Sequence, residues 1–343
     1  CTCIVSLYNI TWIMEVYIMT VLFLTNLNDY FKSRVDDLIK EFPNDRFVIP
    51  QDRAEGDILL KNAEIIVSGS LTAEQIERAE RLKCVIVPWA GVNELPFETI
   101  RKREIIVSNN HGNGKIVAER AVALALSVMG RIVEYHNDLS KGVWHGFEVG
   151  SKGEDLWYSL QGKKVSILGL GTIGRHIAHL LSAFDCEFMG YKRNVEQVDG
   201  IRYVTNNIDE AIAFGKVIFV ALPLTKETKG IINKERIEAM SGKFLINVGR
   251  GTLIDEEALY HGLKDHILAG AGIDTWYLYP RSTEVQLPSK YPIHTFPNVV
   301  ISPHVGGFTV EGLVGRIDET IENIRHALVT GRPKTVVDLE NEY

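Results

Sequence analysis

Three glycines at a fixed spacing lie where a predicted strand passes into a predicted helix. Gly169, Gly171 and Gly174 form the pattern G-x-G-x-x-G, with Thr172 and Ile173 between the last two. The first glycine allows a tight turn, the second lets the backbone approach a pyrophosphate, and the third permits close packing of helix on strand. Unpaired N–H groups at the start of the helix favour bound phosphate. This context predicts a dinucleotide-binding turn rather than a glycine turn without a ligand.

Two cations follow the next predicted strand, at the position that reads the adenosine ribose of a dinucleotide. NAD-preferring sites carry Asp or Glu there, which accepts hydrogen bonds from the ribose hydroxyls. This chain has Lys192 and Arg193 instead. Cations cannot accept those hydrogen bonds, but they pair with a 2′-phosphate. We therefore expect NADP(H) to be the preferred cofactor and NAD(H) to be possible; the alternative is a pair of solvated charges at a strand end.

Apolar runs alternate with polar helical patterns along most of the chain, which predicts an α/β fold with two doubly wound parallel sheets. An apolar helix is expected at 116–135, buried between domains or at a subunit interface, and an amphipathic helix at 309–330. The predicted strands are 21–24, 47–49, 65–67, 85–87 and 105–107 in a first series, and 165–168, 187–189, 217–221, 244–247, 269–273 and 299–301 in a second.

The composition fits a globular chain of two domains, with 343 residues, 45% hydrophobic and 24% charged, and a net charge of −7. An acidic chain argues against binding to nucleic acid or to an anionic membrane. The apolar stretch 1–24 contains Glu15 and lacks a basic flank, so residues 1–18 are interpreted as an N-terminal extension. Four cysteines do not make a disulfide scaffold, and no His/Cys cluster has metal-ligand spacing. We expect reduced thiols, a cytoplasmic location and no metal.

Five segments share their order and spacing with one known enzyme family. They are 169–174 (GLGTIG), 222–228 (LPLTKET), 247–251 (NVGRG), 271–274 (AGID) and 302–307 (SPHVGG). From about residue 21 to residue 337, the chain resembles the D-isomer-specific 2-hydroxyacid dehydrogenase family. The resemblance implies a Rossmann NAD(P)-binding domain at 111–305, inserted into a flavodoxin-like substrate domain made of 19–110 and 306–343. The active site would lie in the cleft between them.

The resemblance assigns the catalytic groups. Arg250 follows the predicted strand at 244–247, and its planar fork can bind a substrate carboxylate while polarising the adjacent ketone. His304 lies in a glycine-flanked loop after the strand at 299–301, and histidine is suited to proton transfer near neutral pH. We expect Arg250 to orient the substrate, and His304 to donate the proton in reduction and to accept it in oxidation.

At a third catalytic position the sequence departs from the family pattern. Tyr279, before Pro280, stands where the family usually has Glu, whose carboxylate pairs with the catalytic histidine and raises its pKa. A phenol can hydrogen-bond the imidazole, but it carries no charge near neutral pH. We expect an enzyme whose His304 has a lower pKa, working at lower pH or at a reduced rate. The alternative is a chain that keeps the fold for another purpose; intact Arg250 and His304 favour the first interpretation.

Further positions take their roles from the resemblance. The loop residues Ala90, Gly91 and Val92 are expected to bind substrate together with Arg250. Besides the glycine turn and the two cations, the expected cofactor-binding residues are Leu222, Pro223, Thr228, Val248, Gly249 and Asp274, the last near the nicotinamide.

Together these features predict an oxidoreductase that transfers a hydride between NAD(P)H, with NADPH preferred, and a small 2-oxoacid to give a D-2-hydroxy acid. The alternative function is a dinucleotide-sensing or protein-interaction module on the same fold, with weakened catalysis. A homodimer is expected from the resemblance, and the apolar helix at 116–135 fits one.

Overall fold

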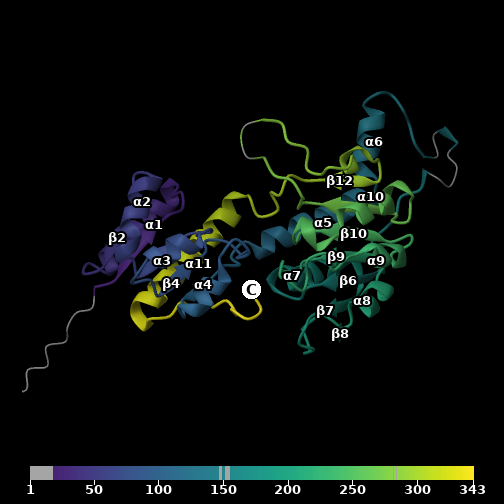
Figure 1. Ribbon diagram of the computed structural model, residues 1–343. Helices are drawn as coiled ribbons and strands as arrows, with labels where there is room; N and C mark the ends of the chain where they lie inside the picture. The colour runs from purple at the N-terminus through teal and green to yellow at the C-terminus, as the bar shows by residue number, and fades with distance from the viewer. Residues whose placement is uncertain (1–17, 147–148, 151–154, 281, 283) are drawn as a thin grey trace, which may run out of the picture.

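The computed structural model describes residues 18–146, 149–150, 155–280, 282 and 284–343, and it forms two α/β lobes (Figure 1). The extension expected at 1–18 lies almost wholly outside the described residues. Each lobe is built on one parallel sheet, which confirms the predicted fold class of two doubly wound parallel sheets. Among the described residues, no helix is both long and apolar enough to span a bilayer.

As far as the structure describes it, the first lobe holds a five-stranded sheet and five α-helices. Its elements are β1 (Thr20–Phe23), α1 (Asp29–Glu41), β2 (Arg46–Val48), α2 (Arg53–Leu59), β3 (Ile65–Val67), α3 (Ala73–Arg78), β4 (Cys84–Ile86), α4 (Phe97–Lys102), β5 (Ile106–Ser108) and α11 (Val310–Thr330). The strand order is β2-β1-β3-β4-β5, as in flavodoxin-like folds. All residues of β3 and β4 are buried, because helices cover both faces of such a sheet.

The second lobe holds a seven-stranded sheet. Its elements are α5 (Gly114–Met129), α6 (Ile132–Leu139), β6 (Lys164–Leu168), α7 (Thr172–Leu181), β7 (Glu187–Tyr191), β8 (Tyr203–Thr205), α8 (Ile208–Phe214), β9 (Val217–Val220), α9 (Lys234–Ala239), β10 (Phe244–Asn247), α10 (Glu256–Lys264), β11 (Gly270–Ile273) and β12 (Val299–Ile301). The order β12-β11-β10-β9-β6-β7-β8 contains the Rossmann arrangement. The sequence pattern missed β8, because this three-residue edge strand is only partly buried.

The helix expected at 116–135 is two helices, α5 and α6. The Gly130 N–H caps α5 by donating to the carbonyl of Leu126 (2.9 Å). Arg131 then takes a left-handed conformation, with φ of 51°, which is costly for a residue with a side chain. Its guanidinium pairs with Glu134 at 2.6 Å, which helps to hold the turn. The chain is redirected there, and α6 projects from the second lobe (Figure 1).

Glycines in β11 let α5 pack closely on the second sheet. A Cβ added at Gly270 would lie 2.8 Å from Cγ2 of Val128, and one at Gly272 would lie 2.9 Å from Cβ of Leu124. The apolar side chains of α5 are therefore buried within their own lobe.

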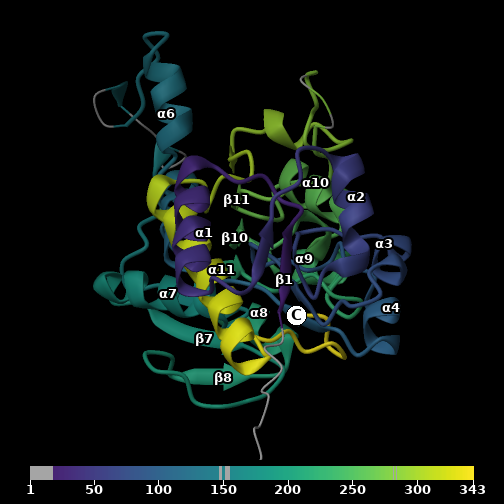
Figure 2. The ribbon, with the colours of Figure 1, turned by 90° about the vertical axis from the view of Figure 1, so that its left-hand side faces the viewer.

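Helix α11 returns to the first lobe and lies beside α1 (Figure 2). Ile317, Ile321 and Ile324 on this helix are buried in the core of the first sheet. Near the point where the chain leaves the first lobe, a Cβ at Gly112 would lie 2.2 Å from the carbonyl oxygen of Gly315. The outgoing and returning segments therefore touch backbone to backbone.

Candidate active site

The glycine turn after β6 has the shape of a phosphate cradle. Gly169 has φ of 103°, and a Cβ there would lie 2.6 Å from the carbonyl oxygen of Ala221. A Cβ at Gly174 would lie 2.0 Å from the carbonyl oxygen of Gly169, so α7 is pressed onto the turn. By contrast, a Cβ at Gly171 would meet no atom within 4 Å. The Gly171 backbone faces open space at the N-terminus of α7, where N–H groups and the helix dipole favour phosphate.

Residues from two neighbouring loops lie against this turn. A Cβ at Gly169 would be 2.9 Å from the main-chain nitrogen of Leu222, and a Cβ at Gly249 would be 2.9 Å from the carbonyl oxygen of the same leucine. The Thr228 hydroxyl donates to the carbonyl of Pro223 (2.6 Å). Thr228 is buried, so its hydroxyl closes the loop after β9. The dinucleotide residues expected on three separate loops thus share one edge of the second sheet.

The other residues expected to bind the cofactor lie at the ends of strands and at the start of α7. Thr172 and Ile173 form the first turn of α7, and Cγ2 of Thr172 lies 2.7 Å from the position of a Cβ at Gly114 of α5. Val248 extends the sheet by donating its N–H to the carbonyl of Val220 (3.1 Å). This edge can hold a dinucleotide. Within the described ranges, no group of three or more His, Cys, Asp or Glu side chains is placed to hold a metal ion.

Both cations after β7 are paired with glutamates. Lys192 forms an ion pair with Glu196, which lowers the pKa of that carboxyl. Nη2 of Arg193 lies 2.8 Å from Oε2 of Glu227. The two glutamate side chains are 66% and 72% exposed. Exposed ion pairs contribute only about 0–1 kcal/mol, so these carboxylates hold the two cations weakly.

Arg250 of the second lobe reaches the loop after β4 of the first lobe. It stands between β10 and the 3-10 helix η5 (Gly251–Leu253), and its Nη1 donates to the carbonyl of Gly249 (2.8 Å). A Cβ at Gly91 would lie 2.1 Å from Nη2 of Arg250. The guanidinium therefore lies against the Gly91 backbone, which a larger residue would prevent. Burial lowers the pKa of Arg250 and the nearby Glu94 opposes this, but a guanidinium stays charged at neutral pH.

Asp274, which follows β11, holds the loop that carries His304. Its buried carboxylate accepts hydrogen bonds from the backbone N–H groups of Val305 (3.1 Å) and Gly306 (2.9 Å) and from the Ser302 hydroxyl (2.5 Å). His304 has φ of 56°, in the left-handed region. Such backbone strain persists only where the surroundings over-determine it, and it collects at functional sites. Asp274 supplies that restraint and so fixes where the imidazole lies.

His304, Tyr279 and Arg250 form one cluster. The ring centroids of Tyr279 and His304 are 5.4 Å apart, with the rings tilted by 54°. Desolvation and the positive charge of Arg250 lower the pKa of His304, and the negative charge of Asp274 offsets this only in part. Burial raises the pKa of Tyr279, so the phenol is uncharged near neutral pH. The cluster contains a permanent cation, an uncharged aromatic ring and an imidazole that readily loses its proton.

Tyr279 contacts His304 in a different way from the sequence-based expectation. Its hydroxyl accepts a hydrogen bond from the backbone N–H of Trp276 (3.1 Å), and no Tyr279–imidazole hydrogen bond occurs among the described residues. Trp276 in turn donates its Nε1–H to the carbonyl of Ser302 (2.8 Å). The Tyr279 hydroxyl is thus hydrogen-bonded to the segment after β11, and Tyr279 contacts His304 through its aromatic ring.

The loop expected to bind substrate is braced on both sides of Gly91. Trp89 lies on Gly69, where an added Cβ would be 1.5 Å from Cζ2 of the indole. The Asn109 side-chain amide donates to the carbonyl of Ala90 (2.8 Å), and Val92 is buried. These contacts hold the glycine backbone facing the guanidinium.

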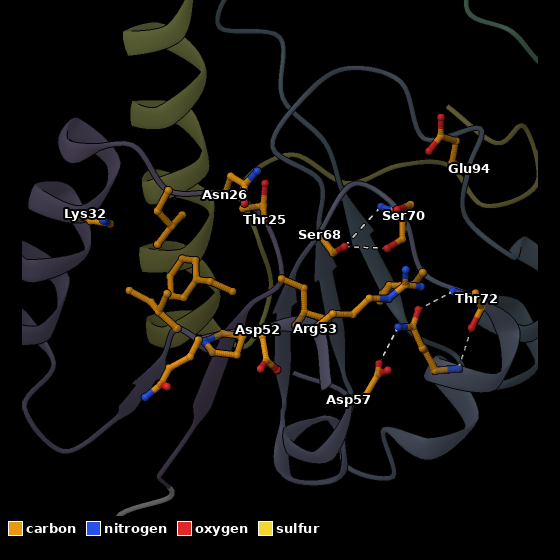
Figure 3. A pocket seen from close by; sticks show the side chains of 18 residues that line it. Thr25, Asn26, Lys32, Asp52, Arg53, Asp57, Ser68, Ser70, Thr72 and Glu94 are labelled. Atoms are coloured by element: carbon orange, nitrogen blue, oxygen red, sulfur yellow. Dashed lines mark hydrogen bonds between the residues drawn. The ribbon is translucent and has the colours of Figure 1, made fainter. Parts of the chain in front are cut away.

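A hollow of about 610 Å³ opens at the carboxyl edge of the first sheet (Figure 3). Arg53, the first residue of α2, extends across it toward Ser70, and Lys32 lies on the other side. Glu94 lines the hollow and also acts on the pKa of Arg250. Through Glu94, the hollow therefore adjoins the cluster of Arg250, His304 and Tyr279.

Sequence reasoning missed three of these contributors: Gly69, Glu94 and Ser302. Ser302 lies inside the 302–307 motif, so its place beside His304 was a usable signal. Glu94 and Gly69 are ordinary loop residues in the sequence, and only the packing of one loop on another gives them a role.

Comparison with known proteins agrees with this arrangement. The family model described as D-isomer specific 2-hydroxyacid dehydrogenase, NAD binding domain, matches residues 93–306. A glyoxylate reductase of Thermofilum pendens is 30% identical over 313 residues, which cover 88% of this chain and 87% of that protein. The hydroxyphenylpyruvate reductase of Plectranthus scutellarioides is 30% identical over 323 residues, covering 91% and 96%.

A solved structure gives the same result. The NADPH-dependent glyoxylate/hydroxypyruvate reductase of Sinorhizobium meliloti, in complex with NADP and malonate, is similar with a TM-score of 0.75 and 26% identity, covering 94% of this chain and 98% of that one. Because the family match extends over more than half of the sequence and the relatives align along nearly their whole length, this chain belongs to the D-isomer-specific 2-hydroxyacid dehydrogenase family.

Proposed function

We propose that this chain reduces a small 2-oxoacid to a D-2-hydroxy acid with NADPH as its preferred cofactor and NADH as a possible one. The observation that carries the proposal is the position of Arg250, whose guanidinium lies against the Gly91 backbone and acts electrostatically on His304. Reduction of a 2-oxoacid needs a cation that binds its carboxylate and polarises its ketone, and a proton donor for the ketone oxygen. A loop without side chains at this point leaves room for the substrate. Relatives named as glyoxylate and hydroxyphenylpyruvate reductases support the same class of substrate.

Arg250 binds the substrate carboxylate and polarises the ketone. Its fork presents parallel N–H donors that match a carboxylate, and Gly91 leaves the space above its Nη2 free of side chain. Partial burial strengthens the attraction, because fewer water molecules compete for the guanidinium. Ala90 and Val92 keep the glycine in place through the Asn109 hydrogen bond and through burial.

His304 is the group that transfers the proton. In reduction the protonated imidazole donates to the ketone oxygen, and in oxidation the neutral imidazole removes a proton from the hydroxyl. NADPH, when bound at the glycine turn, supplies the hydride. Because the pKa of His304 is lowered, the donor form is scarce at neutral pH, so Tyr279 in place of a carboxylate favours reduction under acidic conditions.

Two cations support the cofactor preference. Lys192 and Arg193 follow β7, the place where a dinucleotide presents its ribose, and each forms an ion pair with an exposed glutamate. A 2′-phosphate carries more charge than either carboxylate and binds guanidinium bidentately. NADP in the complex of the Sinorhizobium meliloti reductase is consistent with this choice.

The second candidate function is a dinucleotide sensor on the same fold. The neutral Tyr279 beside His304 favours it, since the family's charged partner is missing. Turnover assays with NADPH and glyoxylate, hydroxypyruvate, pyruvate or phenylpyruvate at acidic to neutral pH separate the two functions. Cofactor binding without turnover of any of these acids would support the sensor.

We propose the domain boundaries that the sequence predicts: a substrate domain of 19–110 and 306–343 and a cofactor domain of 111–305. The end of β5 at Ser108 and the contact of Gly112 with Gly315 support boundaries at these two crossings. Deuterium exchange with and without NADPH would contradict them if protection spread evenly over both lobes.

Arg250→Lys keeps the charge but removes the fork, so we expect kcat/KM for the 2-oxoacid to fall about 100-fold or more. Binding of NADPH, measured by fluorescence titration, should stay within about twofold, because Arg250 is assigned to the substrate. A variant that retains kcat/KM within about threefold would contradict the role of Arg250.

Tyr279→Glu places a carboxylate beside His304 and should raise its pKa. The donor form of His304 is present below its pKa and lost above it, so reductive kcat/KM falls as pH rises through that value. In the unaltered protein the pKa of His304 is lowered, so this fall lies at more acidic pH than for an ordinary histidine, and in Tyr279→Glu it should move up by about one pH unit. Tyr279→Gln introduces a side chain of the same size as glutamate but without its charge, so it should leave the pH profile of reductive kcat/KM unmoved. An equal shift of the profile in both variants, or in neither, argues against tuning by charge.

Replacement of Lys192 and Arg193 by alanine removes the partners of the 2′-phosphate. We expect the Kd of NADPH to rise at least about tenfold while the Kd of NADH changes little. Tighter binding of NADH than of NADPH by the unaltered protein would defeat the proposed preference.

We also propose that the chain forms a homodimer through α6 and its surroundings. Ile132, Val133, Trp144 and Trp157 are each more than 40% exposed, with Ile132 at 56%, and large exposed apolar areas mark interfaces. Sedimentation analysis should give twice the mass of one chain, and Ile132→Asp should lower it toward one chain. Ile58→Asp, on α2 of the other lobe and 73% exposed, should leave the mass unchanged; a monomeric unaltered protein would refute the dimer.

A further inference from the structure

The segment that follows α11 ends in a tight turn, Asp338 to Tyr343, which we call the strap. The Asp338 carboxylate accepts from the backbone N–H groups of Glu340 (2.9 Å) and Asn341 (3.1 Å). Its own N–H donates to the carbonyl of Tyr343 (3.0 Å), which closes the turn. Hydrogen bonds from Asn341 hold the pKa of Asp338 below its ordinary value. In Figure 1 the yellow trace of this segment runs from the first lobe to the C label between the lobes.

One carboxylate of the strap lies between cations of the two lobes. Oε1 of Glu342 is 3.4 Å from Nη1 of Arg101 on α4 and 3.2 Å from Nζ of Lys226 in the loop after β9. The same Arg101 nitrogen donates to the carbonyl of Leu339 (2.7 Å). Glu342 is only 17% exposed in its side chain and has φ of 58°. A glutamate keeps this left-handed conformation only where its surroundings impose it, so both cations restrain the strap.

The other two side chains of the strap hold Arg193. The side-chain oxygen of Asn341 accepts a hydrogen bond from Nη1 of Arg193. The ring of Tyr343 lies under the guanidinium, with the Cζ atom 5.4 Å from the ring centroid. Glu227 accepts from Nη2 at 2.8 Å. One edge and one face of the guanidinium thus belong to the strap, whereas the Glu227 carboxylate is exposed and exchangeable.

We propose that the strap is a positioning element for cofactor discrimination: it orients Arg193 to receive the 2′-phosphate of NADPH, and it does so from an anchor on the substrate lobe. This inference rests on the proposed function, because it concerns the cofactor site proposed there. An arginine side chain loses much rotamer freedom when it binds an anion, and a side chain that is already ordered loses less. The strap stacks on one face and bonds one edge, while the incoming phosphate replaces Glu227. The anchor through Arg101 and Glu342 makes this orientation depend on the approach of the two lobes.

The test is the ratio of NADPH to NADH affinity in the intact chain of 343 residues. Tyr343→Ala and Asn341→Ala each remove one strap contact with Arg193, and Arg101→Ala releases the anchor. For each we expect the Kd of NADPH, measured by fluorescence titration, to rise about fivefold to tenfold, and the Kd of NADH to stay within about twofold. Tyr343→Phe keeps the ring and should retain the affinity for NADPH. Glu340→Ala is the matched control, since this strap side chain has no hydrogen bond or ion pair among the described residues.

The outcomes separate the strap from the proposed function. An unchanged affinity ratio in Tyr343→Ala and Asn341→Ala, or an equal loss for both cofactors, overturns the strap while the proposed function stands. If the unaltered protein does not prefer NADPH, both the cofactor preference and the strap are overturned. NADPH binding with the expected changes, but without turnover of any 2-oxoacid, supports the strap and overturns the proposed reaction. Melting curves of the variants should match that of the unaltered chain, because Tyr343 is 45% exposed and not part of a core.

Discussion

The contact of the Arg250 guanidinium with the Gly91 backbone joins two sheets that have no strand in common. A side chain at position 91 would occupy the place of Nη2, so the distance between the lobes at this point is set by the absence of a Cβ. Many features of the first lobe serve this contact. Trp89 rests on Gly69 and Asn109 bonds to Ala90, and together they keep the loop after β4 from withdrawing. On the other side, β10 and η5 fix the Arg250 backbone.

The same guanidinium determines the electrostatics around His304. A fixed cation disfavours the protonated form of an imidazole beside it, and Arg250 lowers the pKa of His304 in this way. The carboxylate whose charge opposes Arg250 at His304 is Asp274, which accepts three hydrogen bonds from the His304 loop. Buried charge needs such partners, so Asp274 acts mainly as a structural support and opposes Arg250 only in part. With Tyr279 neutral, the balance of charge at the imidazole favours loss of the proton.

The net charge of −7 conceals a local arrangement of cations at the places where anions are expected. Arg250 stands at the edge of the second sheet between the lobes, and Lys192 and Arg193 stand further along that edge. Lys192 and Arg193 are each paired with an exposed glutamate. Their positive charges are therefore balanced locally while the surface as a whole stays acidic. The strap adds a second contact between the lobes, because Glu342 pairs with Arg101 of the first lobe and with Lys226 of the second.

The sequence by itself determined most of the elements and supplied the residues of the candidate site. In the described part of the chain, eleven of the twelve strands follow from apolar runs between turns, because burial in a parallel sheet demands such runs. Glycine spacing located the candidate phosphate cradle. The break at Gly130 and Arg131 was missed, because a left-handed arginine leaves no mark in hydrophobic periodicity. Only the tertiary structure decided which loops meet: Gly91 with Arg250, Asp274 with the His304 loop, and the strap with Arg193. These contacts join residues far apart along the chain, and their distances depend on how two lobes pack, which no local pattern of residue types encodes.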